Sequence, residues 1–445
     1  MNRPEVANKP ACEILLVATW HSLAWLVAAN LVGLLLATLL LIPGLNNHLG
    51  EWTYGRWIPV HLNMQLYGWC SLPLVGWLLK IYQADRIPAS CWSRAALWAW
   101  SAALFAGAVS WLQSHSSGKI FLEWQGYVRV LFPLAMFVLW LVLAGSLRSH
   151  WRSPENAGWR RMGKALGLIV LLAAPFALYW AAGTKVYPPV NPDTGGPTGV
   201  SLAESTLFVV IIFLLIPHGL GRRPKFVQLF KRLTWMWFAL SVGLLLALGH
   251  GNDSHHRLGQ IIALGSLLPW MFLLPAYYNS FEWPDASTSW RRACFFWWGV
   301  LLASAWLVFL PGLLDHFKFT DALVGHSHMA MAGFISSLNC FLLVLVEEAN
   351  QEVFDSLWAF IAWQAGTFGY VGLMFVAGWI EGGDPSFTII PGFGREAIYI
   401  ARLACGVLMA AASIHWLRQV SVKLHRQADV SQRQACAPKL CTSAT

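Results

Sequence analysis

Apolar runs of about 20 residues recur along the whole of this 445-residue chain, and polar or charged residues bound each of them. A helix needs about 20 mostly apolar residues to cross the hydrocarbon core of a bilayer. The chain is 57% hydrophobic and only 11% charged, far from a soluble composition. The pattern predicts an all-α polytopic membrane protein, a bundle of twelve transmembrane helices at residues 13–43, 59–79, 93–112, 127–147, 164–183, 201–217, 232–250, 257–278, 294–314, 323–346, 356–380 and 396–417.

One membrane domain is expected over residues 1–445, with the helices within 13–417 and a cytoplasmic tail at 418–445. The longest outer connection, 184–200, is rich in Pro and Gly, which is typical of a loop rather than a domain. The first apolar run is about 31 residues long, whereas the apolar core of a signal peptide has roughly 7–15. We therefore expect the first helix to remain as an anchor.

Lys and Arg are distributed unevenly between alternate loops. With both termini on the cytoplasmic side, 22 of the 30 basic residues fall on that side and eight on the other, as the positive-inside rule requires. In a protein embedded in the lipid bilayer, this topology by itself explains the net charge of +9. No nucleic-acid partner is needed to explain the basicity.

The eight cysteines stand singly, and none belongs to a C-x-x-C or C-x-x-C-H motif. The second of these motifs attaches c-type haem. The chain is therefore not expected to attach haem covalently, and it shows no copper-thiolate or iron-sulfur pattern.

Six of the fourteen histidines are expected at the outer ends of the predicted helices. Polar groups within a bilayer are costly and usually functional, although any one of these residues could be a satisfied polar group or a loop residue. Two of them are separated by one residue, so on an α-helix they point about 200° apart. One helix could thus hold a metal on each side, and imidazole is the usual ligand of haem iron. The six are His61, His250, His255, His256, His326 and His328.

Several segments resemble subunit I of the haem-copper oxidase superfamily, nearest its cbb3-type oxidase and nitric oxide reductase branches. The strongest are YGRWIPVHLNMQLYGW at 54–69, HSHMAMAGF at 326–334 and the HH pair at 255–256. The resemblance spans nearly the whole chain. It implies a respiratory protein of a bacterial-type inner membrane, supplied with electrons by a cytochrome c-type donor.

The resemblance also implies the roles of individual residues. His61 and His328 would be the axial ligands of a low-spin haem, and His326 would hold a second, high-spin haem, both of b type. A second metal, copper or non-haem iron, would face that haem, with His255 and His256 as two of its ligands. The third ligand expected from helix six is not a histidine here, so His250 is the candidate, and the alternative is that all three are solvated loop residues.

Two further features bear on the chemistry. Helices six and seven contain no Tyr, the electron donor in the oxidases, whereas Glu204 could serve as the carboxylate found in the nitric oxide reductases or simply cap its helix. A carboxylate with imidazole favours iron over copper. Arg395 and Arg402 could bind haem propionates, because a guanidinium can bind a carboxylate with two hydrogen bonds, or could anchor the chain among lipid headgroups.

Three functions are compatible with these residues. The first is a dihaem electron-transfer protein that reduces a small diatomic ligand, as an oxidase or nitric oxide reductase does. The second is a non-catalytic haem electron carrier or sensor whose second-metal site has decayed. The third is a multi-pass transporter whose histidines bind no haem.

Overall fold

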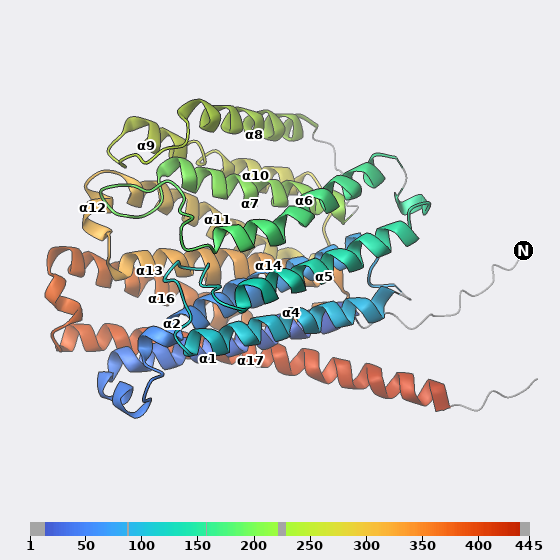
Figure 1. The fold of residues 1–445 in the computed structure, drawn as a ribbon, viewed down its shortest axis with the longest axis horizontal. Coiled ribbons are helices and arrows are strands. Elements are labelled where there is room, and N and C mark those ends of the chain that lie inside the picture. Colours follow the sequence, from blue (N-terminus) through green and yellow to red (C-terminus); the bar gives the residue numbers. More distant parts are fainter. Residues whose placement is uncertain (1–13, 87–88, 157, 221–227, 437–445) are drawn as a thin grey trace, which may run out of the picture.

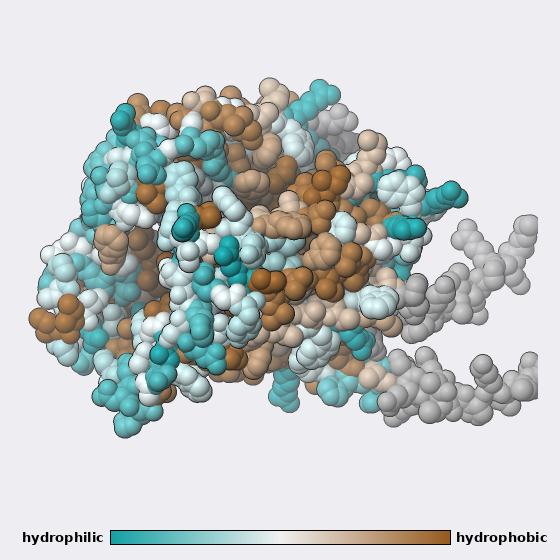
Figure 2. Space-filling model, in the orientation of Figure 1, coloured by the Kyte–Doolittle hydropathy of each residue, from teal (hydrophilic) through white to brown (hydrophobic). Residues whose placement is uncertain are grey.

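The computed structural model describes residues 14–86, 89–156, 158–220 and 228–436, and its regular elements are all helical (Figure 1). Among these residues, eleven helices are long and apolar enough to cross a membrane. The expected all-α polytopic bundle is confirmed. Figure 2 shows apolar side chains across the middle of the visible face and mostly polar ones at its left end, as expected for a bundle that crosses a bilayer.

Nine of the eleven spans are single helices. They are α1 (Ile14–Leu41), α4 (Ala89–Leu112), α5 (Val128–Ser149), α6 (Trp159–Ala181), α7 (Gly199–Gly219), α8 (Gln228–Leu248), α11 (Thr288–Phe309), α16 (Leu357–Gly383) and α17 (Phe393–Cys436). Short helices α12 (Leu313–Phe317) and α15 (Ala349–Phe354) lie in connections, as do the 3₁₀ turns η1 (Pro43–His48), η3 (Pro154–Asn156), η4 (Asp285–Ser287) and η6 (Pro385–Thr388).

Other spans are built from consecutive pieces. One consists of α9 (Leu258–Gly265) and α10 (Trp270–Asn279), and another of α13 (Asp321–His328), the π-helical segment η5 (Met329–Ile335) and α14 (Ser336–Val346). The expected span 59–79 is not among the eleven continuous ones. Instead α2 (Tyr54–Asn63), the π-helical segment η2 (Met64–Cys70) and α3 (Leu72–Ile81) follow one another there, so the number twelve stays a prediction.

The two π-helical segments resemble each other in their packing. Each contains a glycine pressed against a tryptophan: an added Cβ on Gly68 would lie 2.5 Å from Trp25, and one on Gly333 2.6 Å from Trp297. The segments are also linked, because Trp69 Nε1 donates to Ser336 Oγ at 2.8 Å. Such segments occur frequently at functional sites, and here each follows a predicted haem ligand.

The helices run alternately between two ends of the bundle. We call the end where α1 begins and α17 finishes the termini end, and the opposite end, at left in Figure 1, the histidine end. The long helix α17 packs along α1 and α16, which closes the bundle around α2 and α13. Tail residues from 418 onward were expected outside the span, and α17 continues through them to Cys436; residues 1–13 and 437–445 lie outside the described residues.

Candidate functional site

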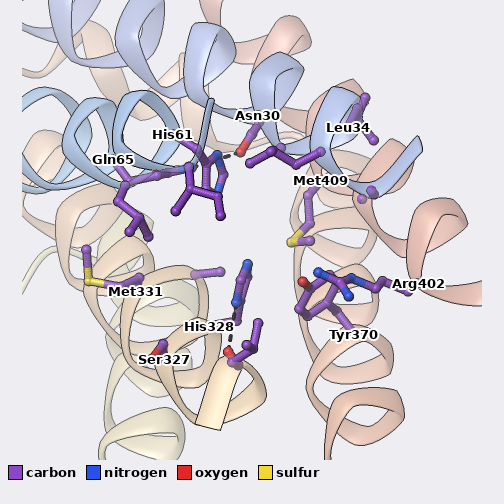
Figure 3. Close-up of a pocket in the computed structure, with 18 of the residues that line it drawn as sticks. Asn30, Leu34, His61, Gln65, Ser327, His328, Met331, Tyr370, Arg402 and Met409 are labelled. Carbon is purple, nitrogen blue, oxygen red and sulfur yellow. Dashed lines mark hydrogen bonds between the residues drawn. The ribbon is translucent and has the colours of Figure 1, made fainter. Parts of the chain in front are cut away.

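A cavity of about 390 Å³ lies inside the bundle, enclosed by residues of α1, α2, α13, α16 and α17 (Figure 3). Its walls are mostly apolar, and the polar groups on them are few. Two of these are imidazoles, and a third is the guanidinium of Arg402. Pockets of roughly 300–1,000 Å³ with this character are typical of cofactor sites.

His61 of α2 and His328 of α13 face each other across the cavity (Figure 3), which we therefore call the histidine cavity. Their ring centroids are 6.4 Å apart, and the ring planes differ by 22°. The Nδ1 atom of His61 lies 2.8 Å from the Ala29 carbonyl oxygen, and that of His328 lies 2.9 Å from the Val324 carbonyl oxygen. A carbonyl only accepts, so Nδ1 carries the proton in both rings and Nε2 keeps its lone pair.

Both Nε2 atoms are therefore available as ligands, and neither makes a hydrogen bond within the described part of the chain. A metal–imidazole bond is about 2.0–2.1 Å long and a ring centroid lies roughly 1.1 Å from its nitrogen, so one ion between two opposed imidazoles separates the centroids by about 6.3 Å. The observed 6.4 Å agrees with this value. The spacing of the two rings is thus the one that a single ion held between them requires.

The position of His61 is fixed closely by α1. A Cβ atom added to Gly33 would lie 2.8 Å from Cε1 of the His61 imidazole, so only glycine leaves room for the ring there. On the other side of the cavity the Tyr370 ring packs on His328, with centroids 4.2 Å apart. Both imidazoles are thus held in place by packing as well as by their hydrogen bonds.

Arg402 of α17 forms the charged corner of the cavity. Its Cζ atom lies 5.3 Å from the centroid of the Tyr370 ring, and its Nη1 atom is 3.9 Å from Asp321 Oδ2. The residue is only 8% exposed, yet its Nε and Nη1 atoms donate no hydrogen bond. Buried donors of this kind are costly unless a partner is provided, so the corner suits an anionic group such as a carboxylate.

Arg395 has a different environment, although the sequence analysis grouped it with Arg402. Its Nε donates to the Thr388 carbonyl at 2.9 Å, and its Nη2 donates to the Leu40 carbonyl at 3.2 Å. It is not among the residues that line the cavity. Arg395 therefore ties chain segments together at the histidine end, while Arg402 faces the cavity.

Other residues of this corner were missed by the sequence analysis. Asp321 donates its backbone N–H to Glu381 Oε2 at 2.6 Å, and Glu381 Oε1 is buried without a hydrogen bond. Charged residues inside a transmembrane segment are usually functional, but Asp321 and Glu381 flank the expected spans, where charges are common. Tyr370 lies inside an apolar run. None of the three therefore carried a signal in the sequence that could have marked it.

His326 lies two residues before His328 on α13 and does not line the cavity. Its Nδ1 atom is buried and has no hydrogen-bond partner within the described chain. The two neighbouring histidines are thus separated onto different sides of α13, as their spacing predicts.

The HH pair lies in the connection between α8 and α9, among the loops of the histidine end. Ligand atoms of Asp193, His255 and His256 lie within 4.8 Å of one another, close enough to hold one metal ion. Asp315 Oδ2 is 3.3 Å from His255 Nε2 and 3.5 Å from His256 Nε2. We call these four residues the loop cluster.

Protein groups already surround the imidazole of His255. It is fully buried, its Nδ1 lies 3.0 Å from Asn191 Nδ2 and 3.5 Å from Asp193, and its Nε2 faces Asp315. The Gly312 backbone N–H and His255 both donate to Asp315, and they hold the pKa of that carboxyl below its usual value. The loop cluster is therefore a hydrogen-bonded junction of three loops that also has the composition of a metal site.

His250 and Glu204 lie apart from this group and pair with each other. The His250 Nδ1 atom is 2.9 Å from Glu204 Oε1, and both side chains are partly exposed. The group that could hold one metal contains Asp193 where the sequence analysis placed His250. Asp193 belongs to the loop 184–200, whose contacts no helical periodicity could indicate.

No protein-family model and no curated protein matches this chain.

Proposed function

We propose that this chain is a membrane electron-transfer protein that binds b-type haem in the cavity, with His61 and His328 as axial ligands. The observation that supports it best is the opposed pair of imidazoles, with centroids 6.4 Å apart and both Nδ1 atoms bonded to carbonyl oxygens. A haem held there would supply a centre that takes up and releases one electron. The chain has no C-x-x-C-H motif, which favours non-covalent, b-type binding.

The residues around the cavity would each have a definite task. The Nε2 lone pairs of His61 and His328 would both hold the haem iron, so other ligands would have no access to it. The unsatisfied donors of Arg402 would receive a propionate. The apolar walls would exclude water and disfavour charge in the cavity. Electron supply would come from a cytochrome c-type donor in a bacterial-type inner membrane, with both termini cytoplasmic.

A reduced-minus-oxidised absorption spectrum of the chain, purified after expression with ample haem, tests this proposal. We expect the sharp α and β bands of a six-coordinate low-spin haem. A preparation that is folded by circular dichroism but shows no Soret band would overturn the proposal and leave the transporter function.

A second candidate function is reduction of a small diatomic ligand, O₂ or NO, at a high-spin haem held by His326. The observation in its favour is the buried Nδ1 atom of His326 without a partner. The reaction would need the second metal, copper or non-haem iron, for which the loop cluster provides His255 and His256. Without that metal, the chain would be the non-catalytic carrier or sensor.

His326→Ala separates these two functions. Loss of a carbon monoxide-binding haem with the low-spin bands retained would support the reductase or oxidase. An unchanged haem content of one per chain in wild type and variant would favour the carrier. Metal analysis of wild type, His255→Ala and His250→Ala would show whether copper or iron is bound and by which residue.

A further inference from the structure

A groove of about 670 Å³ runs along the side of the bundle between α11 and α16, next to the termini end. We call it the α11–α16 groove. Its residues belong to the first turns of both helices, 289–297 of α11 and 360–368 of α16. At 1.5 Å per residue the groove extends for roughly 12 Å along the helices. One leaflet of hydrocarbon is about 15 Å thick, so the groove spans most of a leaflet.

The groove is apolar along its length and cationic at one end. Its walls include Phe296 and Phe368, which are 53% and 64% exposed. Arg292 stands at the beginning of α11 on the rim, its side chain exposed, and no carboxylate of the described residues pairs with it. Ser289, one turn earlier, adds a hydroxyl beside it. From the start of α11 inward, the groove therefore presents a hydroxyl, a cation and then the aromatic wall.

The floor of the groove is part of the packed bundle. Trp297 is 2% exposed and donates its Nε1–H to Gln364 Oε1 at 2.7 Å. Gln364 Nε2 in turn donates to Ser337 Oγ at 3.4 Å. The Trp297 ring also covers Gly333 of η5. The segment η5 packs against both α11 and α16. An occupant of the groove would thus press on the layer that supports η5.

From this arrangement we propose that the α11–α16 groove binds one anionic glycerophospholipid, with its phosphate at Arg292 and one acyl chain along the aromatic wall. Arg292 supplies the charge complementarity, because the described residues give it no carboxylate partner. A zwitterionic lipid has the same phosphate but would bring a second cation close to the guanidinium. A basic residue near the membrane surface contributes about 1 kcal/mol to binding of anionic lipid. The inference is independent of haem, because no residue of the groove lines the histidine cavity.

Native mass spectrometry of the full-length chain in mild detergent tests the proposal, with phosphatidylglycerol or phosphatidylcholine as the added lipid. We expect wild type to retain one phosphatidylglycerol and to bind phosphatidylcholine much more weakly. Arg292→Gln should weaken phosphatidylglycerol binding about fivefold, the factor that corresponds to about 1 kcal/mol. Arg291→Gln is the matched control, because Arg291 is the adjacent arginine and lies outside the groove; its effect should be less than twofold.

A second variant tests the acyl-chain part of the site. Ala365 lines the groove and is exposed, so Ala365→Phe should fill the space and reduce retention of the lipid without disturbing the core. Ala411→Phe, at an exposed position of α17, is its control. Equal affinities for the two lipids, or equal retention by the Arg292 and Arg291 variants, would overturn the proposal. Circular dichroism of each variant confirms that the comparison is made between folded proteins.

Discussion

The histidine cavity and the loop cluster each contain two histidines, but they treat the imidazoles in opposite ways. In the cavity the Nδ1 atoms of His61 and His328 are bonded to carbonyl oxygens, and the Nε2 atoms face open space. In the loop cluster His255 has protein partners at both nitrogens. A ligand site can therefore be recognised by the lone pairs that the fold leaves free. The number of histidines does not distinguish the two regions.

Replacing either cavity histidine should have the largest effect. In His61→Ala or His328→Ala one axial ligand is lost, so we expect the low-spin bands to disappear and electron transfer to stop. Absorption spectra and haem content of the purified variants provide the measurement. His21→Asn is the control, because His21 is also buried in the bundle but bonds to Ser101 at 2.8 Å. If all three variants kept the low-spin bands, the cavity would lose its distinction from the loop cluster.

Replacing His255 should destabilise the chain without affecting haem. In His255→Ala the groups that bond to the imidazole lose a buried partner, which typically costs about 1–3 kcal/mol. We expect a lower thermal unfolding midpoint and an unchanged haem spectrum. His256→Ala should lower the midpoint less, because that side chain is 53% exposed. A changed haem spectrum in His255→Ala would show that the two regions are coupled.

A methyl group on Gly33 should shift the cavity pair without removing a ligand. The added Cβ atom would lie 2.8 Å from His61 Cε1, so the ring must move by a few tenths of an ångström. We expect haem affinity to fall several-fold and the Soret band to shift. Gly372→Ala provides the control, since an added Cβ there meets nothing within 4 Å. Identical titrations of the two variants with haem would contradict the close packing of His61.

The smallest expected effect is a pH dependence at the loop cluster. Hydrogen bonds from Gly312 and His255 lower the pKa of Asp315, so its contribution to stability is present above the unfolded pKa of about 3.9 and is lost as pH falls through the folded pKa. Thermal midpoints measured from pH 6 down to pH 3 should fall less steeply in Asp315→Asn than in wild type. Parallel curves would show that Asp315 contributes no pH-dependent stability.

The sequence predicted the membrane spans well because hydropathy and helix length are local properties. It did not predict the breaks within three of them, since π segments and the turn at Pro269 leave the apolar composition of a span unchanged. The opposed position of His61 and His328 agrees with the expectation from the resemblance, and their role as haem ligands stays a prediction. The separation of Arg402 from Arg395 required the positions of α1 and α16. That Asp193 lies beside the HH pair depends on a loop distant in sequence, and the role of His250 as a metal ligand stays a prediction.

The π segments η2 and η5 decide where the site tolerates a change in chain length, which its composition does not reveal. A π-helical segment carries bonds five residues apart where an α-helix has four, so seven residues of η2 advance the chain about as far around the axis as six α-helical ones. Deleting one residue from 64–70 would therefore let the segment become α-helical with little rotation of the two halves of the span. Deleting one residue from the α-helical part after 70 would instead rotate the halves by about 100° against each other. Both deletions leave the hydropathy profile almost unaltered, but only the second would carry His61 off the cavity wall.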